Sequence, residues 1–356
     1  MFSDDARVKE VKWLGKGDQL VWLKEVDFGA TELWIANGDA EGRGAINLRQ
    51  PSMIESESRA ISRRYCAGRI RAKATHLKVH RLRNEHDDIA IAVACPATTN
   101  GNLYNAEDAD LAATIEVRNA VWYATLRKKE MTSGANDVKY IVSPANFVNA
   151  VRGTGLECSL NSAVGSSSGF DISSSGIVFL AKDVSAACKS PQSIDVYYIP
   201  LKSFTEAAEP KPQIVQVRGL EGRSSNPVFS PNGDSIAFLK KGHPINLDDR
   251  NRVIVINNMR DFRAHMAIDK APTQESEKHW HLSPYTVAWS ENGKELYVVA
   301  VEAGIRRLFK LPATLSSIRA APEPITSTSV VPADIRYLRM VFSAPMDPTL
   351  VHRPKS

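Results

Sequence analysis

The most informative stretch of the sequence is Phe229-Ser230-Pro231-Asn232-Gly233-Asp234-Ser235-Ile236-Ala237-Phe238. A large apolar residue is followed by a polar turn containing Asn-Gly and then by an apolar run. Asn-Gly tolerates positive φ values, and between apolar segments it is a strong signal of a β-hairpin. The stretch therefore predicts two antiparallel strands joined by a tight turn.

The same phrase recurs along the chain. It returns as Trp289–Val298 (WSENGKELYV) and Trp13–Trp22 (WLGKGDQLVW), and in a shorter form as Ile172–Phe179 (ISSSGIVF). The starts at 172, 229 and 289 are 57 and 60 residues apart. A hairpin unit that repeats at this spacing is typical of propeller blades. We therefore predict an all-β fold, with a β-propeller of about six or seven blades over residues 1–313. An irregular, Pro-rich C-terminal tail is predicted over residues 314–356.

Alternating or apolar runs predict further strands around these hairpins. They are Glu32–Ala36, Leu77–Leu82, Ile89–Ala94, Ala120–Leu126 and Val138–Val142. Three more runs are predicted to be the outer strands of their blades: Asp195–Leu201, Arg252–Ile256 and Arg307–Leu311.

Composition limits the class of protein. With 356 residues and 43% hydrophobic content, the chain can bury a sizeable core. No apolar run approaches the roughly 18 residues that span a bilayer, so we expect no membrane partner. The start, Met1–Arg7, is acidic and lacks an apolar segment, so we do not expect it to be a signal peptide.

The four cysteines have no C-x-x-C spacing. They are Cys66, Cys95, Cys158 and Cys188. Buried small hydrophobic residues are the favoured interpretation. A Cys158–Cys188 disulfide around the Phe170–Phe179 hairpin is the alternative, which spacing alone does not decide.

Basic residues gather in one region of the chain. They are Arg63, Arg64, Arg69, Arg71, Lys73, Lys78, Arg81 and Arg83. Because they are scattered through alternating strand sequence with Tyr65 as the only aromatic residue, a solvated strand face is favoured over a nucleic-acid patch. We expect no nucleic-acid partner.

One string matches the G-x-S-x-G pattern of a hydrolase nucleophile, Gly165–Gly169. That serine needs a buried strand before it and a helix after it. Ser159–Ala163 is no hydrophobic strand, and Phe170 begins a hairpin, so Ser167 is predicted to lie in a loop between blades. Five histidines follow, but none has the strand-end context of a catalytic base: His243, His265, His279, His281 and His352. We assign no catalytic residue.

Two segments contain side chains of the kinds that bind metal ions. His279 and His281 would point the same way on a strand, with Glu275 and Glu277 nearby, but two histidines alone are an incomplete site. A loop that packs Trp280 against a blade is the favoured alternative. Asp248-Asp249 lacks the calcium-loop pattern and is interpreted as a turn. We expect no metal and no cofactor.

Several longer strings resemble a known family. Ser225–Leu239 resembles the propeller of prolyl-oligopeptidase-family serine peptidases. Other strings resemble the fungal dipeptidyl-peptidase V branch of that family, and the likeness spans roughly residues 8–313. Those strings are Asn149–Glu157, Phe170–Gly176, Val196–Lys202, Asp248–Arg252 and Trp289–Leu311.

The resemblance implies that substrate access and catalysis belong to two different domains. In this family a propeller covers an α/β-hydrolase domain and restricts access to short peptides, while Ser, Asp and His of the hydrolase cut them. Members of the branch are secreted and release dipeptides. This chain departs from them around Ala113–Val121, which looks shortened, and at its start. Only about 40 irregular residues follow Leu311 where the hydrolase would begin, far fewer than such a domain needs.

We therefore expect the gating propeller of a serine dipeptidyl peptidase, inactive alone and meeting peptide substrates through the hydrolase. The resemblance implies secretion, whereas the start of the chain suits the cytoplasm. The alternative is a stand-alone propeller that binds other proteins, with Ile335–Phe342 as a closing strand. An enzyme with its site on the propeller face lacks a convincing cluster of catalytic residues.

Overall fold

A computed structural model describes most of the chain between residues 8 and 324. The described ranges are 8–14, 19–26, 29–37, 64–82, 84–98, 117–130, 138–142, 147–160, 169–184, 193–206, 209–243, 249–259, 261–267, 282–302, 305–313 and 323–324. They contain 22 β-strands and no α-helix. Within these ranges, then, no helix has the length and apolar character needed to cross a membrane. The chain divides into two compact units, residues 1–157 with 200–211 and residues 158–199 with 212–356.

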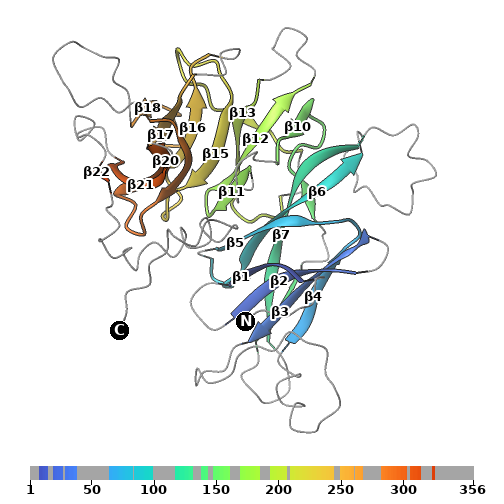
Figure 1. Ribbon diagram of the computed structural model, residues 1–356. Coiled ribbons are helices and arrows are strands. Elements are labelled where there is room, and N and C mark those ends of the chain that lie inside the picture. Colours follow the sequence, from blue (N-terminus) through green and yellow to red (C-terminus); the bar gives the residue numbers. More distant parts are fainter. Residues whose placement is uncertain are drawn as a thin grey trace, which may run out of the picture. The chain divides into compact units, whose positions relative to one another are not determined.

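Unit 1 contains two antiparallel sheets whose strands follow one another in chain order (Figure 1). Sheet A consists of β1 (Val8–Trp13), β2 (Gln19–Glu25), β3 (Thr31–Asn37) and β4 (Arg64–Ile70). Sheet B consists of β5 (Thr75–Arg81), β6 (Ile89–Thr98), β7 (Val117–Glu130) and β8 (Val138–Val142), and β9 (Val148–Asn149) also pairs with β7.

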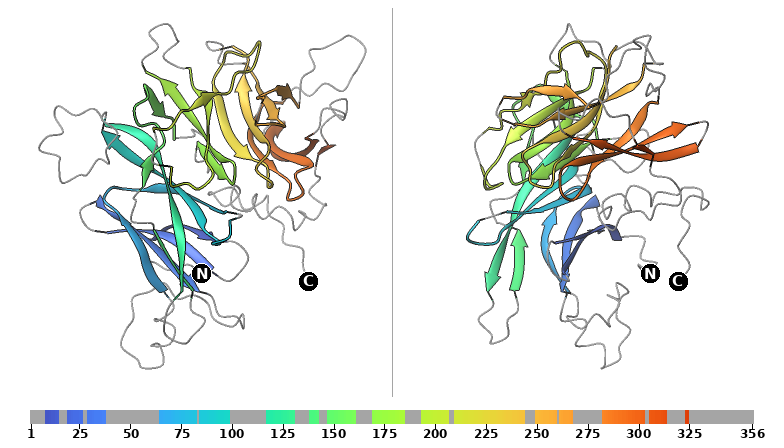
Figure 2. Two further views of the ribbon diagram at one scale, coloured as in Figure 1. Left: turned by 180° about the vertical axis from the view of Figure 1, so that it is seen from behind. Right: turned by 90° about the vertical axis from the view of Figure 1, so that its left-hand side faces the viewer.

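Unit 2 contains the remaining sheets, which Figure 2 shows from two further directions. Sheet C consists of β10 (Leu156–Cys158), β12 (Gly176–Asp183), β13 (Asp195–Pro200) and β14 (Gln213–Ile214), with β11 (Phe170–Ser173) paired to β12. Sheet D consists of β15 (Ser224–Phe229), β16 (Ile236–Lys241), β17 (Asn251–Ile256) and β18 (Ala264–Met266). Sheet E consists of β19 (Pro284–Trp289), β20 (Glu295–Glu302), β21 (Ile305–Pro312) and β22 (Glu323–Pro324).

The predicted fold class is confirmed. Sheets A, D and E are four-stranded meanders in chain order, and sheets B and C add a fifth strand to the same plan. A series of such sheets is the architecture of a β-propeller. The described ranges supply five sheets, and the blade count and the 313/314 boundary stay predictions. The short strand β22 lies beyond residue 313.

The repeated hairpin turns have the same hydrogen bonds in sheets D and E. The Ser230 hydroxyl accepts a bond from the Ser235 N–H (3.0 Å) and donates to the Asn232 side chain (2.6 Å). The Ser290 hydroxyl makes the equivalent bonds to Glu295 and Asn292. The glycine of each turn has positive φ, 78° at position 233 and 69° at position 293. The repeated sequence therefore specifies one turn geometry. Gly occupies this position because other residues rarely adopt a positive φ.

Three predicted outer strands are in fact third strands. β13, β17 and β21 cover the predicted runs, and each pairs on its far side with a short fourth strand. Those fourth strands, β14, β18 and β22, are two or three residues long. An alternating pattern needs about four residues to be recognised, so the sequence did not reveal them.

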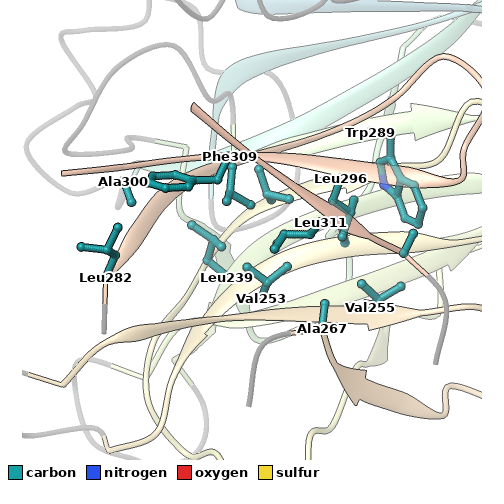
Figure 3. Close-up of a cluster of buried hydrophobic side chains, with 14 residues drawn as sticks. Leu239, Val253, Val255, Ala267, Leu282, Trp289, Leu296, Ala300, Phe309 and Leu311 are labelled. Atoms are coloured by element: carbon teal, nitrogen blue, oxygen red, sulfur yellow. The ribbon is translucent and has the colours of Figure 1, made fainter. Parts of the chain in front are cut away.

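Sheet D is apolar on both faces because it is buried on both sides. Val253 and Val255 of β17 belong to a cluster shared with sheet E, whereas Ile254 and Ile256 belong to one shared with sheet C. All four side chains are fully buried. Figure 3 shows the first cluster, where side chains of β17 approach Leu311 of β21. A continuous apolar run of this kind is typical of a strand covered on both faces.

Candidate functional site

The first strands of the sheets carry residues with an unusual backbone conformation. A residue with positive φ lies three positions before three of the repeated hairpins: Glu10 (51°), Gly169 (67°) and Asn226 (52°). His76 on the first strand of sheet B has φ of 57°. Positive φ is uncommon outside glycine and persists where surrounding contacts enforce it. The side chains near these positions are therefore examined for their contacts with neighbouring sheets.

In unit 1 the side chain of Glu10 joins sheet A to sheet B. Glu10 sits in a bulge of β1 between Lys9 and Lys12. Its carboxylate accepts hydrogen bonds from the backbone N–H groups of His76 and Leu77 on β5. A bulge redirects a side chain out of the regular alternation. Here it turns a carboxylate toward the next sheet, where charge-assisted hydrogen bonds form.

In unit 2 side chains of β11 and β15 likewise bind the backbone of the next sheet, and they link sheets C, D and E. The Asp171 carboxylate on β11 accepts a bond from the Phe229 N–H on β15 (2.9 Å). Asn226 on β15 donates its side-chain amide to the Tyr285 carbonyl on β19 (2.5 Å). The polar groups of these first strands are thus engaged in holding neighbouring sheets together. The role of these side chains is therefore structural.

A charged surface pocket of about 540 Å³ lies in sheet B, where the β5–β6 turn approaches β7. Its lining residues are Glu85, His86, Asp87, Asp88, Arg127 and Lys128. Arg81 makes a two-pronged ion pair with Asp87, and Asn84 bonds the buried Asp88 through both its side-chain amide and its side-chain carbonyl. The lining offers both signs of charge but no serine or cysteine nucleophile.

Asp249 lies just before β17 and binds backbone groups that follow β16. Its carboxylate accepts bonds from the backbone N–H groups of Gly242 and His243 and pairs with Arg252 (3.2 Å). Burial raises the pKa of the Asp249 carboxyl, but the bonds from His243, Arg252 and Gly242 outweigh it and lower that pKa below the usual value. The carboxylate therefore joins the residues that follow β16 to Arg252 of β17.

Most sequence candidates for chemistry lie outside the described residues. They are Ser167, Asp248, His279, His281 and His352. Within the described part, His243 is exposed and His265 is half-buried and bonded to the backbone of Ala313. The same part of the chain holds no group of three or more His, Cys, Asp or Glu arranged around a metal-sized space.

Two of the cysteines are buried as predicted, Cys95 and Cys158. Cys66 is exposed on the edge strand β4, where the prediction of a buried residue was wrong: the register of β4 against β3 shifts beside it, which interrupts the regular alternation of side chains. Cys188 lies outside the described residues, so the disulfide alternative stays a prediction.

The described members of the basic group are exposed or half-buried, as a solvated strand face requires: Arg64, Arg69, Arg71, Lys73, Lys78 and Arg81.

No protein-family model matches the chain. The chain is 29% identical over 332 residues to a probable dipeptidyl-peptidase 5 of Arthroderma benhamiae and 28% identical over 340 residues to dipeptidyl-peptidase 5 of Trichophyton tonsurans. Each match covers 88% of this chain and 41% of the relative. The chain therefore spans less than half the length of these curated relatives, and the resemblance predicted from the sequence is confirmed.

Solved structures with a similar arrangement include a prolyl endopeptidase, with a TM-score of 0.41, 10% identity, and coverage of 87% of this chain and 33% of that one. The β-propeller domain of the Trilobed protease from Pyrococcus furiosus gives a TM-score of 0.36 at 9% identity, with coverage of 90% and 84%.

Proposed function

We propose that this chain, a homologue of dipeptidyl-peptidase 5 over 88% of its length, forms the substrate-gating propeller of a serine dipeptidyl peptidase. The observation that carries the proposal is the match itself. It extends across both compact units yet takes up 41% of the relative. On this proposal the chain corresponds to the part of the relative that admits peptides.

The arrangement of side chains supports a gating role better than a catalytic one. A serine hydrolase needs a nucleophile hydrogen-bonded to a base and an oxyanion hole beside it. One hydroxyl–imidazole bond joins Thr75 Oγ1 to Nδ1 of the adjacent His76 (3.0 Å), and the carboxylates of Glu10 and Asp171 bind backbone groups of neighbouring sheets. We place the serine, its base and the acyl-enzyme chemistry in the part of the relatives that this chain does not match.

A chimaera tests the proposal. This chain would replace the matched segment of the Arthroderma benhamiae relative, and hydrolysis of a dipeptidyl chromogenic substrate would be compared with hydrolysis of casein. We expect the chimaera to cleave the small substrate and to spare casein, because the propeller admits only short peptides.

The controls are the parent relative and the rest of the relative without any propeller. A folded chimaera with the casein-to-dipeptide ratio of the propeller-free control would contradict gating. A folded chimaera without peptidase activity, beside a stable and monomeric chain alone, would favour the stand-alone interaction module.

A further inference from the structure

The connection between β13 and β14 leaves its own compact unit. The two strands pair in sheet C of unit 2, yet residues 200–211, which run between them, belong to unit 1. An ordinary hairpin connection has about two to five residues, so this one is long. We call residues 200–211 the strap, because the chain passes through it from unit 2 into unit 1 and back.

Phe204 anchors the strap on sheet B. Its side chain is fully buried and meets the ring of Tyr123 on β7 edge to face, with ring centroids 6.0 Å apart. Thr125, two residues along β7 and on the same face, donates its hydroxyl to the Ser203 carbonyl (2.6 Å). The Tyr123 hydroxyl reaches the Glu206 carbonyl (3.4 Å). Because a buried aromatic side chain loses its favourable burial when it leaves its site, Phe204 is the main point of attachment.

The backbone of this anchor has an unfavourable conformation. Phe204 has φ of 57°, a value that is uncommon outside glycine and persists where contacts enforce it. The turn around it is held by bonds within the strap. The Glu206 carboxylate accepts the N–H groups of Lys202 (2.7 Å) and Ser203 (2.8 Å). The Thr205 N–H donates to the Ser203 hydroxyl (3.3 Å). The turn is therefore formed by its own bonds, whereas its docking depends on Phe204 and on the two bonds from β7.

We propose that the strap is a releasable tether that restrains unit 2 against unit 1, with Phe204 as its anchor. The chain also passes between the units after residue 157, and that passage remains when the strap lifts. The docked strap adds two further passages, at residues 199–200 and 211–212, and holds both close to sheet B. Once released, residues 200–211 can extend over as much as about 40 Å, at roughly 3.3 Å per residue, which frees the two units to move.

The tether gives the proposed gate a means of regulation. Release of the strap loosens the propeller and widens the passage that peptides use. This step rests on the proposed function, whereas the coupling of the two units does not. The two therefore need separate measurements.

Pulsed electron paramagnetic resonance on the full chain tests the tether. Spin labels at Glu85→Cys in unit 1 and Glu291→Cys in unit 2, both exposed positions, report the distance between the units. The labelled chain also carries Cys66→Ser and Cys188→Ser, so that the labels attach at the introduced cysteines. We expect Phe204→Ala to broaden the distribution of distances and to shift it to longer values, because the shortened side chain no longer holds the strap.

Phe262→Ala is the matched control. Phe262 also has a positive φ (49°) and packs edge to face against an aromatic ring, that of Tyr198 (5.7 Å), but both residues lie within unit 2. Its truncation should leave the distances between the units unchanged. Thr125→Val keeps the shape of the side chain and removes the bond to Ser203, so it should broaden the distribution less than Phe204→Ala. This milder variant decides the matter if Phe204→Ala does not fold.

Distances that stay narrowly distributed in the folded variants of the strap site, or that broaden equally in Phe262→Ala, would overturn the tether. The chimaera described above then tests the link to gating, and with Phe204→Ala we expect its casein-to-dipeptide ratio to rise. Broadened distances with an unchanged ratio would support the tether and contradict its part in gating.

Discussion

The carboxylate of Asp249 joins the residues that follow β16 to Arg252 of β17. It gathers two backbone N–H groups, from Gly242 and His243, and the Arg252 guanidinium around one side chain. The sequence predicted a turn here because the calcium pattern is missing. It did not predict the bond to Arg252, since ion pairing depends on how the chain returns along β17.

Replacing this carboxylate should destabilise the fold in a pH-dependent way. We expect Asp249→Ala to lower the free energy of unfolding by about 1–2 kcal/mol at pH 7, because backbone donors lose a charged acceptor. The folded pKa lies below the ordinary 3.8, so the stabilisation is present above that pH and is lost as pH falls through the folded value. Urea unfolding at pH 7 and pH 3 should show the difference shrink in acid.

Asp261→Ala is the control for that experiment. Asp261 is 43% exposed and pairs with Arg263, which is 89% exposed. An exposed pair of this kind contributes little, so we expect a change below about 0.5 kcal/mol. Equal effects of the two substitutions would contradict the role assigned to Asp249.

Lys240 and Asp195 form a buried ion pair that links sheets C and D. Lys240 is 3% exposed, lies 3.0 Å from Asp195 and also reaches the Ser224 hydroxyl at 3.2 Å. Asp195→Asn should therefore cost about 3 kcal/mol or more in the free energy of unfolding, because it leaves the Lys240 charge buried and unpaired.

Adding Lys240→Met to Asp195→Asn should recover much of that loss, since no buried charge then remains. Chemical denaturation of both single variants and the double variant measures the coupling. Lys310→Met, at a pair about one-third exposed, should change stability by less than about 1 kcal/mol. Strictly additive effects at Lys240 and Asp195 would show that the two side chains do not depend on each other.

At the scale of elements, the hairpins were predictable and the sheet edges were not. Phe229–Phe238 carries its own turn signal, and that signal fixed two strands and their register. The bulge at Asn226 was not predicted, because its side-chain bond to Tyr285 depends on the next sheet, 59 residues further along the chain. The two-residue strand β14 likewise forms only because β13 offers it a partner.

The two Asn-Gly turns offer a matched pair of substitutions. Gly233→Ala and Gly293→Ala both force alanine into a left-handed conformation, which costs about 1–2 kcal/mol. At position 233 the new methyl group would also lie 3.0 Å from the Ser173 side chain, whereas at 293 the nearest atom, in Pro231, is 3.7 Å away.

We therefore expect Gly233→Ala to be the more destabilising of the two, as measured by thermal or urea unfolding. Ser173 is fully buried and its hydroxyl bonds the Ser175 hydroxyl (2.7 Å), so it has little freedom to move aside. Equal losses would mean that backbone strain alone governs both turns.

For the molecule as a whole, the sequence predicted the fold class, because a hairpin repeated at a spacing of 57 and 60 residues is compatible with few folds besides a propeller. The sequence did not predict the hydrogen bonds from side chains to backbone groups that join the sheets. Glu10 and Asp171 look like ordinary surface residues until the neighbouring sheet brings backbone donors to them. The charged pocket was missed for the same reason, since Asp87 and Arg127 lie far apart in the sequence and only the folding of sheet B brings them together.

The proposed separation of gating from catalysis leads to a prediction for the whole chain. Purified residues 1–356 should neither react with a fluorophosphonate probe nor hydrolyse a dipeptidyl chromogenic substrate. The probe needs a serine activated by a base, and the proposal places that serine in the part of the relatives that this chain does not match. Ser167→Ala is the control, because G-x-S-x-G is the string that most closely imitates a nucleophile. Stoichiometric labelling that Ser167→Ala abolishes would show that the loop contains a working nucleophile. Catalysis would then belong to this chain, and the division of labour proposed for it would be wrong.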